Sequence, residues 1–309
     1  MRFDFFTLGG RFFWEDIYNY QNWRIQRHIR TRHYRLIDPN DIRRDSGSFN
    51  HCKETLLKYI DAFELDEPYE DTVLIIHNFA RTKNSVQYIA EAFDDAKVNV
   101  IAVNYASLHN NLYAHAQLLT QFLKNIEIKR NLYIINVGAA CLLTRKLLSS
   151  SNNYRNYKIA RILDVNPINS GSDFCELLAY TGFFRALLGP MLSDISTRRA
   201  ITIPVIPQDI EHGIIFCPST MKKLTQKILS RFDSFPFLTP PSEQSYAENI
   251  KTIPETTFFP LENRDLILNC RQFILTGTFL EDSEETENFT DTDSQKNHKK
   301  IDYEYLTIL

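Results

Sequence analysis

The chain has 309 residues, of which 43% are hydrophobic and 13% aromatic, and its formal net charge is −3. This length and apolar content predict a globular chain with one large domain and some additions, and they exclude a chain that is disordered over most of its length. The small net charge gives no overall reason to expect nucleic acid or an acidic membrane as a partner. Five scattered cysteines without a C-x-x-C pair argue against a zinc site and a disulfide framework. We therefore expect free thiols in a reducing compartment.

The first residues do not resemble a targeting segment. Asp4 interrupts the apolar stretch and no small-residue cleavage site follows, so we expect no signal peptide. Charges or turn-forming residues interrupt every window of about 18 residues, so we also expect no transmembrane helix. Together these observations predict a cytoplasmic chain.

Residues 1–68 form an N-terminal extension that is rich in basic and aromatic residues. Such a mixture can bind nucleic acid or a membrane surface, but arginine stems and aromatic rings also pack across a larger domain. We favour packing on the core. A turn is expected at 38–40 and an amphipathic helix at 52–63. The arginines are Arg24, Arg27, Arg30, Arg32, Arg35, Arg43 and Arg44.

From residue 71 the pattern alternates between short apolar runs and helical periodicity. This alternation predicts the α/β class, with a doubly wound and mostly parallel sheet. The main domain is expected at 69–280, with a helical cap insertion at about 174–195, and the polar stretch 281–309 as a disordered tail. The expected strands are 73–77, 98–103, 132–137, 159–165, 213–216 and 257–259. The expected helices outside the insertion are 85–93, 112–126, 139–148 and 265–276.

Several fragments of this domain follow one another in an order typical of a known family. They resemble the α/β-hydrolase fold, and more narrowly the bacterial lipase/esterase-like α/β-hydrolases, over roughly residues 70 to 280. The resemblance implies that the strand–turn–helix at 131–148 is the elbow that carries a nucleophilic serine. The fragments are LIIHNFARTKNS at 74–85, VIAVNY at 100–105, NVGAACLLTR at 136–145, NPINSGS at 166–172 and LGP at 188–190.

The chain departs from this family at the residues that carry the chemistry. Aligning the elbow on Leu142 and Arg145 places the family's serine at Gly138. The family's histidine falls at Asn263, and its acid falls in the Thr239/Pro240 region, which holds no carboxylate. Asp233 and Glu243 lie just outside that region. A glycine offers no nucleophile, and an asparagine cannot accept and return a proton. The resemblance therefore implies a catalytically inactive α/β-hydrolase-like protein.

A binding site is expected to survive these losses. The backbone amides around Asn78, Phe79 and Ala139 should still point at the vacated site, and this arrangement suits an anion or a carbonyl oxygen. Gly138 should widen the site. The resemblance gives the adjacent His77 a structural role. We expect a small acyl or ester-like ligand there, with no cofactor and no metal.

Two alternatives stay open. The first is an active carboxylic-ester hydrolase or lipase that uses relocated residues, with Ser107, His109 and Cys141 as candidates. Cys141 is more typical of helix–sheet packing, and His115 is expected on a helix surface. The second concerns the apolar side chains of the insertion, which could line an acyl pocket, pack the cap on the body or contact a membrane. They are Phe174, Leu177, Leu178, Phe183, Phe184, Leu187 and Leu188.

Overall fold

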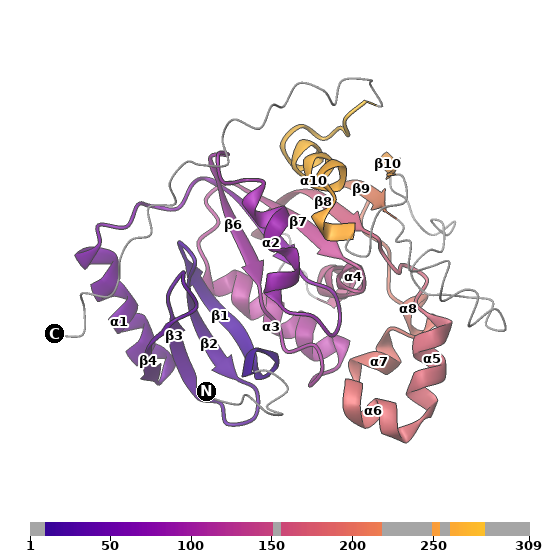
Figure 1. Ribbon diagram of the computed structural model, residues 1–309, viewed down its shortest axis with the longest axis horizontal. Helices are drawn as coiled ribbons and strands as arrows, with labels where there is room; N and C mark the ends of the chain where they lie inside the picture. Colours follow the sequence, from indigo (N-terminus) through magenta and orange to yellow (C-terminus); the bar gives the residue numbers. More distant parts are fainter. Residues whose placement is uncertain (1–9, 151–155, 218–248, 254–259, 282–309) are drawn as a thin grey trace. The chain divides into compact units, whose positions relative to one another are not determined.

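The computed structural model describes residues 10–150, 156–217, 249–253 and 260–281 (Figure 1). The described helices and strands belong to one compact unit, Met1–Phe279. The predicted tail at 281–309 lies outside the described residues, apart from Glu281. Within the described part of the chain, no helix combines the length and the apolar character needed to cross a membrane.

The N-terminal extension contains an antiparallel sheet that the sequence did not predict. After the short 3-10 helix η1 (Gly10–Phe13), its four strands pair in chain order. Strand alternation places Trp23, Ile25 and Leu36 on a buried face. The predicted helix, α1, packs against β2, β3 and β4, and its Tyr59 ring stacks on Trp23 at 4.7 Å. The strands were missed because the face opposite these apolar residues carries polar side chains that are nevertheless buried. The elements are β1 (Trp14–Tyr20), β2 (Trp23–His28), β3 (Tyr34–Ile37), β4 (Arg43–Gly47) and α1 (Phe49–Ala62).

The second sheet has six strands in the order β10-β9-β8-β7-β5-β6, and every pairing is parallel. The predicted doubly wound, mostly parallel sheet is confirmed. The strand expected at 257–259 lies outside the described residues, and β10 forms the edge of the described sheet. The strands are β5 (Asp71–Ile76), β6 (Val98–Val103), β7 (Asn131–Val137), β8 (Lys158–Val165), β9 (Glu211–Phe216) and β10 (Asn249–Thr252).

Helices cover both faces of this parallel sheet, as expected for strands that are apolar on both faces. Alternate residues of β7 enter two separate apolar clusters: Leu132 and Ile134 join the one with α3 and α4, and Tyr133 and Ile135 the one with α2 and α10. The short 3-10 segments η2 and η4 precede α2 and α10. The elements are η2 (Lys83–Val86), α2 (Gln87–Glu91), α3 (Leu112–Asn125), α4 (Ala140–Ser150), η4 (Pro260–Glu262) and α10 (Arg264–Thr276).

The predicted helical insertion follows β8, and a glycine lets it approach the sheet. Gly189 has a φ of +79°, and a Cβ there would lie 1.8 Å from the carbonyl oxygen of Leu108, in the loop after β6. Asp194 also accepts a 2.8 Å hydrogen bond from the backbone amide of Leu112 at the start of α3. The insertion contains α5 (Asp173–Tyr180), α6 (Gly182–Leu188), α7 (Met191–Asp194) and α8 (Thr197–Ala200).

Candidate functional site

The turn from β7 into α4 lies at the carboxyl edge of the parallel sheet, where ligands bind in open α/β sheets. Its central residue, Gly138, has a φ of +58°, in the left-handed region that favours glycine. Its amide donates a 2.9 Å hydrogen bond to the carbonyl of Val165 at the end of β8. The chain therefore forms the sharp strand-to-helix elbow that the resemblance implies, with a residue that adopts it without strain.

The side chain of Asn78 fills the space above the elbow. Asn78 lies just beyond β5, the strand paired with β7. A Cβ built on Gly138 would lie 2.4 Å from both Cγ and Oδ1 of Asn78. The expectation that Gly138 widens the site is therefore wrong, because the carboxamide of Asn78 occupies the volume that a larger residue at position 138 would need.

The same carboxamide is hydrogen-bonded to two backbone amides of the expected binding site. Oδ1 of Asn78 accepts hydrogen bonds from the amide of Phe79, at 2.8 Å, and from the amide of Ala139, at 2.9 Å. In α/β-hydrolases the residue after the nucleophile and a loop after an earlier strand supply the two amides that stabilise an oxyanion. In this chain the carboxamide oxygen of Asn78 accepts from the corresponding amides, those of Phe79 and Ala139.

His77 supports this arrangement as a buried, neutral ring. Its Nδ1 lies 2.8 Å from the carbonyl oxygen of Asn78, and its Nε2 lies 3.4 Å from the amide of Tyr105. The Tyr105 ring stacks on it at 4.4 Å, and the Tyr105 hydroxyl donates to the carbonyl of His77. Burial lowers the pKa of His77 to about 4, so the imidazole is neutral near pH 7. These contacts hold the backbone beside Asn78.

The structure does not assemble the candidate replacement nucleophiles into a reactive group. Ser107 is fully buried, and its Oγ accepts a 3.1 Å hydrogen bond from the amide of Ala80. His109 stacks on Phe13 at 4.3 Å. Cys141 is fully buried in α4, as expected for a packing residue; burial raises its pKa, and the charge of Asp164 raises it further. A thiol in such surroundings stays protonated and unreactive.

His115 is not on the helix surface, and that prediction is wrong. Its side chain is 1% exposed, and the Tyr105 ring meets it edge-on at 5.1 Å. The reason is that His115 shares the buried face of α3 with Leu119 and Phe122. Burial, with a smaller effect from His77, lowers the pKa of His115 to about 3.

The resemblance assigns two further positions to a triad, and the structure describes one of them, Asn263. Asn263 is the N-cap of α10: its Oδ1 accepts a 2.9 Å hydrogen bond from the amide of Leu266. Asn263 therefore satisfies one backbone amide of the first turn of this helix. Thr239 and Pro240 lie outside the described residues.

A buried polar network under α4 was missed in the sequence. The Thr144 hydroxyl donates to Asn136, Asn136 donates to Asp164, and His212 Nε2 lies 3.0 Å from Asp164. All four side chains are buried. Polar residues within otherwise apolar strands were the feature of the sequence that could have indicated this network. The Thr144 hydroxyl is already bonded to Asn136, so the network resembles internal support for the sheet and not a catalytic group.

The apolar residues of the insertion are mostly exposed. Leu177, Tyr180, Phe183 and Leu187 keep 44%, 70%, 73% and 46% of their surface in solvent. These exposed side chains do not pack on the body, and none of them lines a cavity described among residues 10–150, 156–217, 249–253 and 260–281. The side chain of Phe174 lies outside the described part of the structure.

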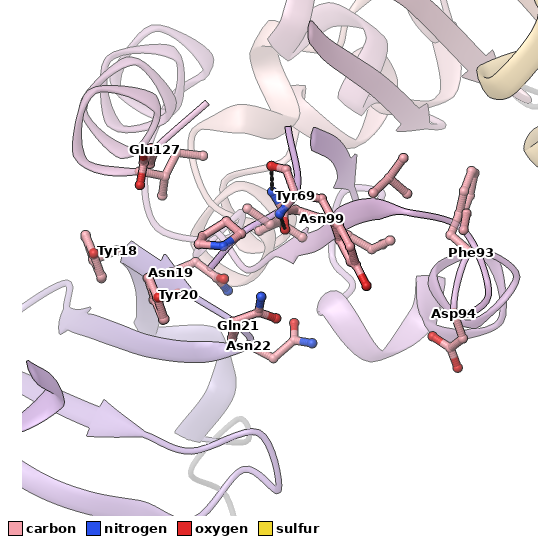
Figure 2. A pocket seen from close by; sticks show the side chains of 16 residues that line it. Tyr18, Asn19, Tyr20, Gln21, Asn22, Tyr69, Phe93, Asp94, Asn99 and Glu127 are labelled. Atoms are coloured by element: carbon pink, nitrogen blue, oxygen red, sulfur yellow. Dashed lines mark hydrogen bonds between the residues drawn. The ribbon is translucent and has the colours of Figure 1, made fainter. Parts of the chain in front are cut away.

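One cavity lies away from the elbow. It has a volume of about 150 Å³ and lies between the β1–β2 hairpin and the amino end of β6, with Tyr18, Tyr20 and Phe93 in its wall (Figure 2). Asn99 and Tyr69 form two backbone–carboxamide hydrogen bonds at its rim, of 2.7 and 2.8 Å. This is the opposite end of the strands from Gly138.

No protein-family model and no curated protein matches the sequence. The structure, however, is similar to the mature form of the lipase BlEst2 from Bacillus licheniformis, with a TM-score of 0.50 and 14% identity. The likeness covers 70% of this chain and 95% of that one. The parallel sheet flanked by helices on both faces agrees with this neighbour. The chain has the α/β-hydrolase fold.

Two further solved structures are less similar. Phospholipase PlaB from Legionella pneumophila has a TM-score of 0.42 and 12% identity, over 52% of this chain and 42% of that one. A lipase-esterase related protein from Clostridium acetobutylicum has a TM-score of 0.40 and 12% identity, over 67% and 93%. The fold rests on the likeness to the mature BlEst2 lipase, which at 14% identity shows the fold and not the activity.

Proposed function

We propose that this α/β-hydrolase-fold protein does not hydrolyse esters and instead uses the retained architecture to bind a ligand or partner. The observation that carries the proposal is the carboxamide of Asn78, which fills the space above Gly138 and accepts hydrogen bonds from Phe79 and Ala139. A substrate carbonyl cannot enter this position while Asn78 occupies it. The elbow is therefore blocked as well as lacking a nucleophile.

The remaining side chains do not offer an alternative covalent route. A replacement nucleophile needs an adjacent base and access to the substrate. Cys141 and Ser107 are fully buried, and the imidazole of His109 is stacked on Phe13. These contacts support inactivity over the alternative of an active esterase with relocated residues.

The ligand that suits the elbow is a small acyl or ester-like molecule, because its carbonyl oxygen could replace the oxygen of Asn78. Such a ligand competes with an oxygen that is already tethered beside the two amides. Only molecules in which Asn78 has moved aside can bind the ligand, so the smaller their fraction, the weaker the apparent affinity of the native protein. The cytoplasmic location and the bacterial origin stay predictions.

Purified protein should show no saturable hydrolysis of p-nitrophenyl butyrate, and neither a fluorophosphonate nor a thiol-reactive probe should label Ser107 or Cys141. Ser107→Ala and Cys141→Ala are the matched variants. Saturable hydrolysis that disappears in either variant, or a single label on one of these residues, would overturn the proposal in favour of the active esterase.

The binding role has its own measurement. Asn78→Gly should bind methyl butyrate about tenfold more tightly than the native protein, because the internal competitor is removed. Titration followed by NMR measures both affinities. Equal affinities, or no binding to Asn78→Gly at all, would exclude the elbow as the ligand site.

A further inference from the structure

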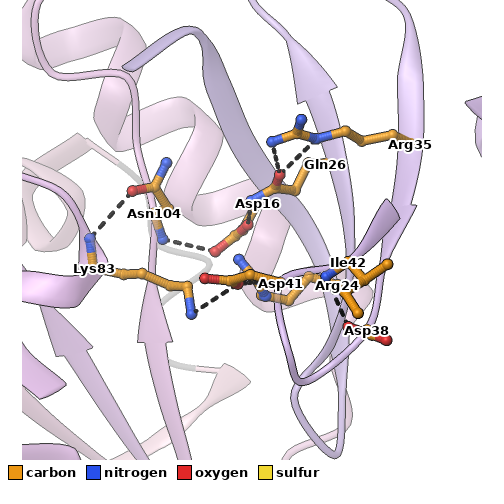
Figure 3. A network of polar contacts seen from close by, with 9 residues as sticks. All are labelled: Asp16, Arg24, Gln26, Arg35, Asp38, Asp41, Ile42, Lys83 and Asn104. Carbon is orange, nitrogen blue, oxygen red and sulfur yellow. Dashed lines mark hydrogen bonds and ion pairs between the residues drawn. The ribbon is translucent and has the colours of Figure 1, made fainter. Parts of the chain in front are cut away.

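The polar face of the N-terminal sheet is buried against the larger domain. Asp16, Arg24 and Gln26 are at most 5% exposed, although they project from the side of the sheet opposite Trp23 and Ile25. Asp16 and Asn104, at the end of β6, exchange two hydrogen bonds of 2.9 and 2.7 Å (Figure 3). This face therefore joins the antiparallel sheet to the carboxyl edge of the parallel one.

A cavity of about 40 Å³ lies within this junction. Its wall contains three basic side chains, Arg24, Arg35 and Lys83, and one carboxylate, Asp41. They come from β2, β3, η2 and the loop before β4, and Figure 3 shows them around the same space. The volume exceeds the space of about 10–15 Å³ that a single water needs. The cavity thus has room for a small ion and an excess of positive charge.

The single lining carboxylate is shared between two of the cations. Asp41 Oδ1 contacts the guanidinium of Arg24 and lies 3.4 Å from Nζ of Lys83. The third cation, Arg35, donates two hydrogen bonds to the neutral Gln26 Oε1, at 2.9 and 2.7 Å, and lies over the Trp14 ring. Gln26 is held in this orientation because its Nε2 donates to Asp16.

The surroundings of Arg35 and Lys83 disfavour their positively charged forms. Burial, and then repulsion from Arg24, lower the pKa of Arg35 to about 10. The same two causes, in the same order, lower the pKa of Lys83. The carboxylates of Asp41 and Asp16 attract both groups, but burial and Arg24 outweigh this attraction. Both groups stay protonated near pH 7, and the three cations still outnumber the two carboxylates, so an anion among them would gain further attraction.

We propose that this cavity binds a phosphate-type oxyanion, either inorganic phosphate or the phosphoryl group of a monoester. Basic groups on three separate elements can reach the oxygens of a tetrahedral anion from several directions, whereas a carboxylate presents its two oxygens in one plane. Bound phosphate would tie β2 and β3 to the loop between β5 and β6. The proposal is independent of the elbow and of the inactivity argued above.

Full-length protein is titrated with inorganic phosphate by calorimetry, near neutral pH and at constant ionic strength. The native protein should bind one phosphate, and Arg35→Gln and Lys83→Gln should each weaken the affinity by about tenfold or more, since each removes a charge-assisted contact. Lys53→Gln is the matched control: it removes one charge from α1, where Lys53 lies over Tyr18, and should leave the affinity unchanged.

Two further measurements identify the source of the phosphoryl group. Competition by glycerol 3-phosphate indicates a soluble monoester, whereas binding to phosphatidic acid vesicles that depends on Arg35 indicates a lipid headgroup. Lys83 is partly exposed, so Lys83→Gln keeps the test valid if Arg35→Gln does not fold. Absence of saturable phosphate binding to the native protein, or equal loss in all three variants, would overturn the proposal and leave the network with a purely structural role.

Discussion

At the scale of single residues, Asn78 and Gly138 depend on each other. The glycine leaves room for the carboxamide, and the carboxamide satisfies the amides of Phe79 and Ala139. Restoring a serine at position 138 alone therefore restores neither the space nor the donors that an esterase needs.

Gly138→Ser should destabilise the protein by about 2 kcal/mol or more, because it adds a left-handed non-glycine residue and a clash with Asn78. Urea unfolding measures the change. In Asn78→Gly/Gly138→Ser the clash is absent, so the double variant should lose less than the sum of the two single losses. Additive losses would show that the two residues are not coupled.

The two buried histidines should make the fold sensitive to acid. Their folded pKa values, about 4 for His77 and about 3 for His115, lie below the usual value near 6.5. The unfolded chain thus binds more protons below pH 6.5, and stability falls as the pH is lowered from there towards 3. Each histidine should contribute a loss of about 3 kcal/mol by pH 4.

His115→Leu tests this loss, since leucine cannot take up a proton. Between pH 6.5 and pH 4, unfolding free energies of this variant should fall by about 3 kcal/mol less than those of the native chain. The carboxylates titrate in both proteins and cancel in the comparison. Parallel pH profiles would mean that His115 is not neutral in the folded protein.

At the scale of elements, Asn263 is the N-cap of α10 and has a structural role there. Asn263→Ala should cost about 1 kcal/mol in unfolding free energy, whereas Asn263→Asp should be nearly neutral because aspartate caps equally well. Thermal or urea unfolding compares the two. A neutral Asn263→Ala would show that the cap contributes nothing.

At the scale of the whole molecule, the N-terminal sheet is joined to the parallel sheet through buried polar groups. Asp16 accepts hydrogen bonds from Gln26 and from the amide of Asn104. Asp16→Ala leaves both donors buried without this acceptor and should cost about 2–3 kcal/mol.

Asp45→Ala is the control for this junction, because Asp45 also accepts from a side chain, Thr55, but lies in the half-exposed β4 region. It should cost about 1 kcal/mol or less. Limited proteolysis should cut residues 10–68 sooner in Asp16→Ala than in Asp45→Ala. Equal costs and equal cleavage would contradict a joining role for Asp16.

The sequence by itself determined the alternation of strands and helices from residue 71, the helix near residues 52–63 and the helical insertion. The loss of the catalytic serine and histidine stays a prediction from the resemblance. Apolar periodicity and turn residues are local, so they can be read without the fold. Only the tertiary structure decided that Asn78 closes the elbow, that His115 is buried and that the basic face of the N-terminal sheet surrounds a cavity. Those outcomes depend on contacts between residues far apart in the chain, 61 positions for Asn78 and Ala139 and 88 for Asp16 and Asn104. Local patterns carry no information on which distant polar group will meet another.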